Sequence, residues 1–229
     1  MLIGAYRVFA YFGLASIFGA LLQGFRYDPA APALNYLYDI ALYGLWAGVH
    51  LVMTRAWFKQ TVFGSPLSSA FERRIFIGVT VSTWLALLWF HRPVPGFALA
   101  LPGWVRFGGN VGLVFAVITF FEGVTFAMLD GLLGVPGAAM THSHGTETPL
   151  FTEGQYARVR HPMYRAALLG GVFSFLVHPT AAQLLWALMI GATFIAFIPV
   201  EEAQLLAARG DAYRTYMERT PWRLFRGVW

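Results

Sequence analysis

Long apolar stretches separated by short polar segments are the feature that most constrains the fold of this chain. Residues 8–25 carry no charge and, as a helix rising about 1.5 Å per residue, are long enough to cross a hydrocarbon layer of about 30 Å. Similar stretches cover residues 36–53, 75–90 and 108–129. Hydrophobic residues make up 58% of the sequence and charged residues only 12%, about half the charged share of a soluble domain. We therefore expect an integral membrane protein.

The longest apolar stretch, residues 166–200, is too long for one perpendicular span and is interrupted by His178-Pro179-Thr180. Proline disfavours helix at the residue before it and lacks a backbone N–H, so this stretch predicts a helical hairpin. The predicted fold is an all-α integral membrane bundle of six transmembrane helices, with a C-terminal helical hairpin and a cytoplasmic amphipathic tail. Because the first arm of the hairpin is short for a full crossing, five spans with a re-entrant or tilted pair are the alternative.

Basic residues gather in three segments that six spans would place on one side of the membrane, namely residues 54–74, residues 158–165 and the tail from residue 209. The positive-inside rule makes that side cytoplasmic, as in the inner membrane of a bacterium. The net charge of +5 is explained by anionic lipid headgroups, so no nucleic acid partner is expected. The sequence has no cysteine, which excludes disulfides, thiolate metal sites and a cysteine nucleophile.

A few ionisable residues stand inside or beside the apolar stretches. His50 and Glu122 lie within predicted spans, where an ionisable group is expensive and suggests function, although both could instead make structural polar contacts. Asp39 lies near a predicted helix end and is expected to be solvated. His142 and His144 are two residues apart in a glycine-rich segment without cysteine, which makes a poor closed site, so no metal is expected.

The segment YARVRHPMY concentrates basic residues just before the hairpin. Pro162 can start a helix because its missing N–H costs nothing in the first turn, so Arg160 and His161 stand at a helix N-terminus that favours an anion. Glu201 and Glu202 stand at the other end of the hairpin, whose two arms return both groups to the same face. Such a site suits a zwitterionic or dipolar ligand. On chemistry alone, a salt bridge at the membrane edge is the alternative.

The same residues resemble a known signature. GQYARVRHPMY, an apolar hairpin and PVEEAQLLAARGDAYRTYMERTP are similar to the C-terminal part of the membrane methyltransferases related to isoprenylcysteine carboxyl methyltransferase and phospholipid methyltransferase. Each element of that signature is present, at Gly154, Tyr156, Val159, Arg160, His161, Pro162, Tyr164, Glu201, Glu202, Leu205, Tyr213, Tyr216 and Pro221.

This resemblance implies that S-adenosylmethionine is the methyl donor, in a cytoplasm-facing pocket between the RHP segment, the hairpin and the tail. It implies donor-binding roles for Tyr156, Arg160, His161, Pro162, Tyr164, Glu201, Glu202, Tyr213 and Tyr216. The candidate catalytic residues are His50, Arg165 and Glu202, with Arg165 facing the pocket. Residues 1–130 would form the substrate side and residues 131–229 the cofactor-binding loop, hairpin and tail of one integrated membrane domain. A small or lipophilic acceptor would enter from the bilayer, and no obligate protein partner is expected.

The N-terminal half, in GVHLVMTRAWFKQ and FERRIFIGVTVSTWLALLWFHRPVPG, is similar to the bacterial methanethiol S-methyltransferases. That resemblance favours S-methylation of a small thiol, such as methanethiol to dimethyl sulfide. The sequence departs from the pattern of those proteins at Leu51, where they tend to have serine. It also departs at Met163-Tyr164, which is closer to the isoprenylcysteine carboxyl and phospholipid methyltransferases. An isoprenylcysteine-like carboxylate and a phospholipid amine are the alternative acceptors. A heme-binding membrane isomerase using His50 and His161, or a non-catalytic membrane protein, is the alternative of another class.

Overall fold

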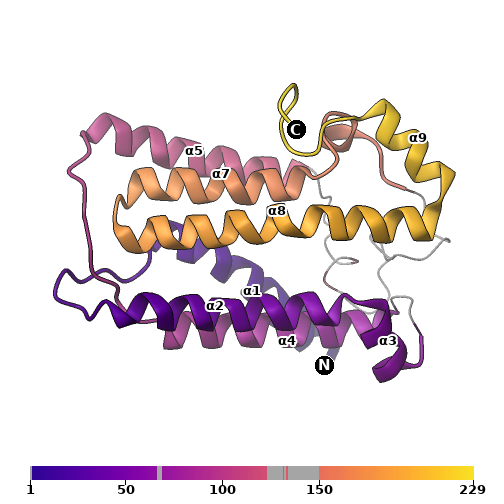
Figure 1. Ribbon diagram of the computed structural model, residues 1–229, viewed down its shortest axis with the longest axis horizontal. Helices are drawn as coiled ribbons and strands as arrows, with labels where there is room; N and C mark the ends of the chain where they lie inside the picture. The colour runs from indigo at the N-terminus through magenta and orange to yellow at the C-terminus, as the bar shows by residue number, and fades with distance from the viewer. Residues whose placement is uncertain (1, 66–68, 123–130, 132, 134–149) are drawn as a thin grey trace.

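The computed structural model describes residues 2–65, 69–122, 131, 133 and 150–229, and every regular element within them is a helix (Figure 1). In chain order these elements are α1 (Leu2–Gln23), α2 (Leu34–Met53), α3 (Ala56–Phe63), α4 (Ala70–Phe90), α5 (Gly103–Glu122), the 3-10 helix η1 (Gly154–Ala157), α7 (Pro162–Val177), α8 (Ala181–Arg209) and α9 (Asp211–Arg219). The predicted all-α bundle is confirmed for this part of the chain.

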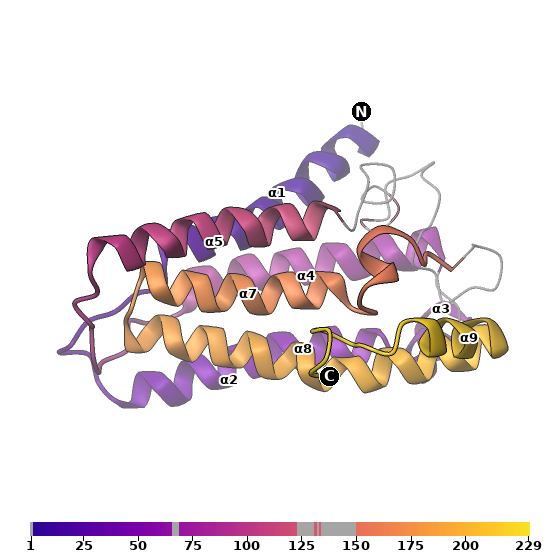
Figure 2. The same cartoon turned by 90° about the horizontal axis from the view of Figure 1, so that it is seen from above.

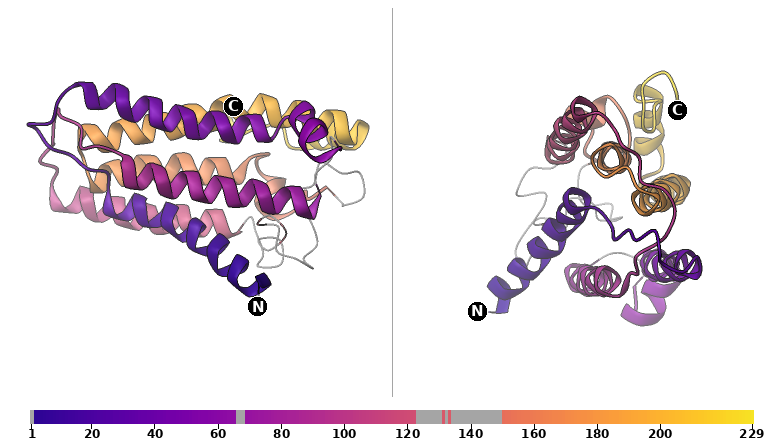
Figure 3. Two further views of the ribbon diagram at one scale, coloured as in Figure 1. Left: turned by 90° about the horizontal axis from the view of Figure 1, so that it is seen from below. Right: turned by 90° about the vertical axis from the view of Figure 1, so that its left-hand side faces the viewer.

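The long helices form two layers joined by a tilted helix. In Figures 1 and 3, α5, α7 and α8 lie side by side in one layer, and α2 and α4 lie together in the other. The packing agrees, because α7 contacts both α5 and α8, α2 contacts α4, and α1 contacts both α4 and α7. Figure 2 shows the N-terminal end of α1 diverging from the rest of the bundle. The fold is therefore a helical bundle in which α1 leans away from the two layers toward its N-terminus.

Three connections meet at one end of the bundle, on the left of Figure 1. We call it the closed end; it is formed by residues 24–33, 91–102 and 178–180. Leu99 N donates to Pro179 O at 2.8 Å, and Phe25 N donates to Gln183 Oε1 at 3.1 Å. These hydrogen bonds join the hairpin to connections that are distant in the sequence, so the closed end holds the two layers in register.

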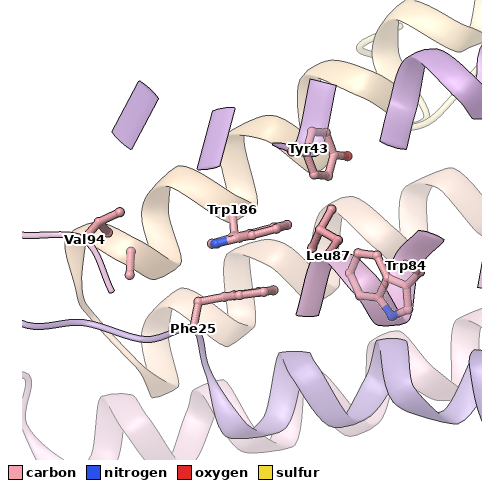
Figure 4. Packing of buried hydrophobic residues seen from close by; sticks show 7 residues of the cluster. Phe25, Tyr43, Trp84, Leu87, Val94 and Trp186 are labelled. Carbon is pink, nitrogen blue, oxygen red and sulfur yellow. The ribbon is translucent and has the colours of Figure 1, made fainter. Parts of the chain in front are cut away.

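An aromatic core fills the bundle just inside the closed end (Figure 4). The Trp186 ring stacks on Phe25 with 4.0 Å between ring centroids and meets Tyr43 and Trp84 edge to face, at 5.5 and 6.5 Å. These residues come from α2, α4, α8 and the connection after α1. Because lipid tails are as apolar as this core, the packing stabilises the bundle mainly through van der Waals contact.

The hairpin predicted around Pro179 is confirmed. α7 ends two residues before this proline and α8 begins two residues after it, with Thr180 Oγ1 capping α8 by accepting from Gln183 N at 3.2 Å. Among the described residues, α1, α4, α5 and α8 are long and apolar enough to span a membrane, and α2 qualifies together with α3 across a bend of 72°. The 16 residues of α7 give only about 24 Å of helix. The C-terminal end of α7 lies at the closed end, but α7 is shorter than the other spans, so the number of six transmembrane helices stays a prediction.

Asp39 differs from the expectation that it is solvated. It is 1% exposed, accepts the Arg92 N–H at 3.0 Å, and lies 3.8 Å from His91 Nδ1. The expectation was wrong because Asp39 stands inside α2, on the face that meets the end of α4. The sequence of a uniformly apolar helix does not mark that face.

α8 is longer than the sequence suggested. It continues through Pro199 to Arg209, so Glu201 and Glu202 lie within the helix and not at its end. Proline removes one backbone donor from a helix, but the turns that follow are held by other contacts. One of these is the bond from Gln204 Nε2 to Thr54 O, at 3.3 Å.

The tail is amphipathic, as predicted. α9 buries Tyr213 and Tyr216, while Asp211 and Arg214 face solvent and form an exposed ion pair. Because the two tyrosines are three residues apart, they lie on one face of the helix. That face turns toward η1 and α8, next to the candidate site.

Candidate active site

Polar side chains gather at the end of the bundle opposite the closed end, which we call the open end; it includes η1, α9 and the first turn of α7. Two backbone hydrogen bonds tie the RHP segment to the tail, from Arg160 N to Trp222 O and from His161 N to Arg223 O, both 2.9 Å long. Pro162 then begins α7, as predicted. Part of the donor capacity expected at this helix N-terminus is therefore used by the tail.

Glu202 is the centre of a buried charged network. Its Oε1 accepts from Arg160 Nε at 2.7 Å and lies 3.2 Å from His161 Nε2, and its Oε2 accepts from Arg223 Nε at 3.0 Å. Arg160 also donates through Nη1 to the carbonyls of Thr220 and Pro221, at 2.8 and 2.7 Å. Such charge-assisted bonds are strong because the donor, the acceptor or both are ionised. Glu202 thus connects α8, the RHP segment and the tail.

Glu201 has a different place, although it is adjacent in the sequence. It is half-buried and lines the cavity described below, with Oε2 at 3.4 Å from His161 Nδ1. The His161 ring therefore lies between two carboxylates. Burial alone would lower the pKa of His161, but the hydrogen bonds and negative charges of Glu201 and Glu202 outweigh it and raise that pKa above its ordinary value of 6.5.

Three tyrosines close the site on the side of the tail. Tyr216 donates its hydroxyl to Tyr156 O at 2.9 Å, and the Tyr213 and Tyr216 rings are 5.7 Å apart. Burial is the main cause that raises the pKa of all three hydroxyls above the ordinary value of 10.0. They therefore stay protonated at physiological pH and offer neutral hydrogen bonds and aromatic faces.

A cavity of about 390 Å³ extends from this network into the bundle. Its outer part, toward the open end, is lined by polar and tyrosine side chains: Arg73, Tyr156, Arg160, His161, Tyr164, Glu201, Arg209, Tyr213 and Tyr216. Its inner part, mainly on the side of α2 and α4, is lined largely by aromatic side chains around one polar pair: Trp46, His50, Phe76, Thr80, Trp84 and Phe197. The volume is typical of a small-molecule site.

His50 is the ionisable group of the inner part. Its Nδ1 lies 3.2 Å from Thr80 Oγ1, and Trp46 Nε1 donates to Thr80 O at 3.3 Å. The ring stands 4.7 Å from the Phe76 centroid and is stacked on Phe197 at 6.0 Å. A histidine from the N-terminal half and the C-terminal signature thus line one cavity, while the functional role of His50 stays a prediction.

The structure separates the predicted site residues into three groups. His50, Tyr156, Arg160, His161, Tyr164, Glu201, Tyr213 and Tyr216 line the cavity. Pro162 and Glu202 lie behind it, where they shape the helix start and hold its charged neighbours. Arg165, predicted to face the pocket, instead donates from Nη2 to Gln155 Oε1 at 2.8 Å and is absent from the described cavity lining. Its place on α7 turns it toward η1.

Several cavity residues were missed by the sequence interpretation, among them Arg73 and Thr80. Arg73 belongs to the basic segment that predicts orientation, and Thr80 is an unremarkable residue of an apolar helix. Only the setting of α4 against α2 and α8 brings both into the cavity; the nearest local signal is the polar first turn of that helix. The side chain of Glu122 and the residues His142 and His144 lie outside the described part of the structure. Among the described residues, no cluster of three metal-ligating side chains occurs.

A helical membrane bundle with a cavity that is charged toward one end and aromatic within defines a membrane protein that can hold a polar and an apolar ligand side by side. No family model matches the chain. Methanethiol S-methyltransferase 2 of Bradyrhizobium diazoefficiens is 31% identical over 199 residues, covering 81% of this chain and 71% of the relative. Methanethiol S-methyltransferase 1 of the same bacterium is 32% identical over 203 residues, with shares of 81% and 66%.

The methanethiol S-methyltransferase of Mycobacterium tuberculosis is 31% identical over 205 residues, with shares of 80% and 77%. The chain therefore belongs to the methanethiol S-methyltransferase family. It is an integral membrane methyltransferase, and the resemblance drawn from its two halves is confirmed.

Proposed function

We propose that this methyltransferase uses S-adenosylmethionine to methylate the sulfur of a small thiol, as the names of its relatives suggest for methanethiol. The observation that carries the proposal is the composition of the cavity at the open end. This cavity joins the C-terminal signature residues, exemplified by His161 and Glu201, to the aromatic wall around His50. Two ligands of unlike polarity can therefore meet there without leaving the protein.

The outer part of the cavity fits the chemistry of the donor. S-adenosylmethionine carries an amino acid carboxylate and ammonium, a ribose diol, an aromatic adenine and a sulfonium. The carboxylate of Glu201 suits a cationic or hydroxyl group, the guanidinium of Arg209 suits the donor carboxylate, and the rings of Tyr156, Tyr213 and Tyr216 suit the adenine. When bound, the donor would supply an electrophilic methyl group on sulfur.

The inner part fits a small apolar acceptor. Trp46, Phe76, Trp84 and Phe197 provide apolar walls, while His50 supplies one basic nitrogen. A thiol reacts as its thiolate, so removal of the thiol proton is the chemical task of the protein, and His50 is placed for it. The rest of the catalysis consists of positioning and exclusion of water, since transfer of a methyl group needs no covalent protein intermediate.

Orientation is part of the proposal. The basic segments around Arg55, Arg158 and Arg214 all lie at the open end, which the positive-inside rule assigns to the cytoplasm of a bacterium with this protein in its inner membrane. The donor would then enter from the cytoplasm, and the acceptor would enter through the bilayer. The lipid bilayer is the expected partner, and neither nucleic acid nor an obligate protein partner is proposed.

The test is a methyl-transfer assay with the purified full chain in lipid nanodiscs. The protein is incubated with methyl-labelled S-adenosylmethionine and, separately, methanethiol, a longer alkanethiol, an isoprenylcysteine analogue and phosphatidylethanolamine. Each product is identified by mass. We expect dimethyl sulfide from methanethiol and no labelled lipid. Labelling of the carboxylate or the amine in place of the thiol would overturn the acceptor assignment, and no labelled product with any acceptor would overturn the methyl-donor assignment.

A further inference from the structure

Arg73 reaches the cavity from the N-terminal half of the chain. It stands in the first turn of α4, whose start is fixed by Ser69 Oγ accepting from Glu72 N at 3.1 Å. Successive residues of a helix point about 100° apart. Glu72 accordingly turns to Lys59, with 3.6 Å between Oε1 and Nζ in a buried ion pair, whereas Arg73 lines the cavity.

The guanidinium of Arg73 lies at the boundary between the inner and outer parts of the cavity. Its central carbon is 5.2 Å from the centroid of the Phe76 ring, which in turn lies 4.7 Å from the His50 ring. On the outer side, Arg73 interacts electrostatically with Glu201 and Tyr164. A positive charge therefore stands between the proposed base and the proposed donor site.

Several elements contribute charged or titratable groups around Arg73. They are Tyr6 on α1, His50 on α2, Lys59 on α3, Glu72 on α4, Tyr164 on α7 and Glu201 on α8. Glu72, which is also paired with Lys59, has the stronger electrostatic attraction to Arg73, and Glu201 adds a second carboxylate that lines the cavity. If Glu201 binds a cationic group of the donor, the charge of Arg73 becomes less neutralised just when the acceptor needs it.

The two arginines of the RHP region are less suited to this task. Arg160 is committed through Nε and Nη1 to Glu202 and to the carbonyls of Thr220 and Pro221. Arg165 is bonded to Gln155 and is absent from the described cavity lining.

We propose that Arg73 promotes ionisation of the acceptor thiol by stabilising its sulfur as a thiolate beside the methyl group of the donor. The proposal rests on the proposed function and adds a catalytic residue to it. The thiol proton first passes to His50. The acceptor sulfur then forms a bond to the methyl carbon, the bond from that carbon to the donor sulfonium breaks, and its electron pair stays on the donor sulfur. A guanidinium keeps its charge at any working pH, so it can stabilise the anion throughout.

The experiment compares a thiol with the matching selenol. Selenols are nearly the same size as thiols but are already ionised at neutral pH, so they depend far less on a cation that promotes ionisation. Arg73→Met, Arg73→Lys and wild type are assayed with methanethiol and methaneselenol at saturating donor. Binding of S-adenosylmethionine is measured separately by titration, which requires no turnover. Arg74→Met is the matched control, because Arg74 neighbours Arg73, stands over the Phe71 ring and does not line the described cavity.

For Arg73→Met we expect the methanethiol rate at neutral pH to fall about 10- to 100-fold, the effect of losing one charged hydrogen bond. The methaneselenol rate should fall much less, donor affinity should stay unchanged, and raising the pH should restore part of the thiol rate. Arg73→Lys should keep a thiol-to-selenol ratio near that of wild type, and Arg74→Met should match wild type throughout.

An equal loss with thiol and selenol would overturn the proposal, and so would a weakened donor affinity, which would assign Arg73 to the donor. If Arg73→Met does not fold, Arg73→Lys becomes the test. Lysine keeps the positive charge, so a thiol-to-selenol rate ratio far below that of wild type would also overturn the proposal. A wild-type protein that methylates neither acceptor would refute the proposed function, and the proposed role of Arg73 would be refuted with it.

Discussion

At the scale of single residues, the pair Glu201-Glu202 shows how adjacent identical side chains acquire different roles. Glu202 is 4% exposed and takes its partners from the RHP segment and the tail, whereas Glu201 faces the cavity. Successive helical positions point in different directions, so one carboxylate holds the architecture while its neighbour meets the ligand. We therefore assign Glu202 to positioning and keep Glu201 for the donor.

Glu202→Gln should destabilise the protein, because it leaves the buried guanidinium of Arg160 without its carboxylate. The expected loss is about 3 kcal/mol or more, the usual result of breaking a buried pair by removing one partner. Glu201→Gln removes one of the two carboxylates beside His161, so it should lower the melting temperature, but less than Glu202→Gln does, and it should weaken donor binding about 10- to 100-fold. Thermal unfolding and donor titration of the two variants distinguish the roles. Equal melting temperatures for both variants would contradict this division.

His50→Ala should lower the turnover of a thiol acceptor by about 100-fold or more, as loss of a general base usually does. Donor affinity should not change, since His50 belongs to the inner part of the cavity. The measurement is kcat at saturating donor together with a donor titration. His178→Ala, at the closed end, is the control and should turn over like wild type. A fully active His50→Ala variant would remove this histidine from the mechanism.

The charge of His161 should make stability depend on pH. Because the folded-state pKa is raised above 6.5, the stabilisation is complete below pH 6.5 and is lost as the pH rises through the raised value. The melting temperature of wild type should therefore exceed that of His161→Gln by most below pH 6.5, and this difference should shrink as the pH rises through the raised pKa of His161. Melting curves of both proteins from acidic to alkaline pH test this prediction. A difference that is constant with pH would show that His161 is not charged between its carboxylates.

At the scale of helices, α5 and α7 approach closely at one glycine. A methyl group at Gly112 would overlap the ring of Phe173, whereas one at Gly108 of the same helix would meet nothing within 4 Å. Small residues at such contacts let helix backbones pack tightly in a membrane.

Gly112→Ala should lower the free energy of unfolding by about 1–3 kcal/mol, because the Phe173 ring must leave its position. Gly108→Ala is the matched control and should be neutral or slightly stabilising, since alanine favours helix more than glycine does. Chemical denaturation in mixed micelles measures both. A Gly112→Ala variant as stable as the control would mean that α5 and α7 are not in contact at this position.

The hairpin can be tested by labelling, because the natural chain has no cysteine. His178→Cys at the closed end and Arg226→Cys in the tail are expected to react with a membrane-impermeant maleimide from opposite sides of the bilayer. The reason is that α7 reaches the same end as the connections after α1 and α4. Intact cells and inverted vesicles supply the two sides. Labelling of both cysteines from one side would favour five spans with a re-entrant pair.

Elements with local signals were predictable from the sequence. His178-Pro179-Thr180 breaks the last apolar stretch, and Pro162 starts a helix wherever its neighbours permit one, so both ends of α7 followed from backbone chemistry. The length of α8 was not predictable, because Pro199 is tolerated only through contacts made by later residues. The burial of Asp39 was hidden for a related reason, since an apolar helix in lipid carries little information on its rotation.

At the scale of the whole molecule, the candidate site depends on how the two halves are placed. His161 and Glu201 could be inferred from one compact signature, whereas Arg73 and Thr80 lie on α4, remote in sequence from that signature. No spacing rule connects them; packing between the layers does. This is why most of the proposed donor residues were predictable, with Arg209 as an exception, and the acceptor wall was predicted only at His50.

The outward lean of α1 has a consequence for the lipid environment. Only 11% of the residues in the apolar span of α1 are buried, against 28% in those of α4, α5 and α8, although Ala10, Gly13 and Ile17 line the cavity. A wall held this lightly takes its tilt partly from the thickness and fluidity of the surrounding bilayer. The apparent affinity for an apolar acceptor should therefore change with acyl chain length, while affinity for a water-borne donor should not. In a cell that remodels its lipids with temperature, the membrane itself would adjust access to this enzyme.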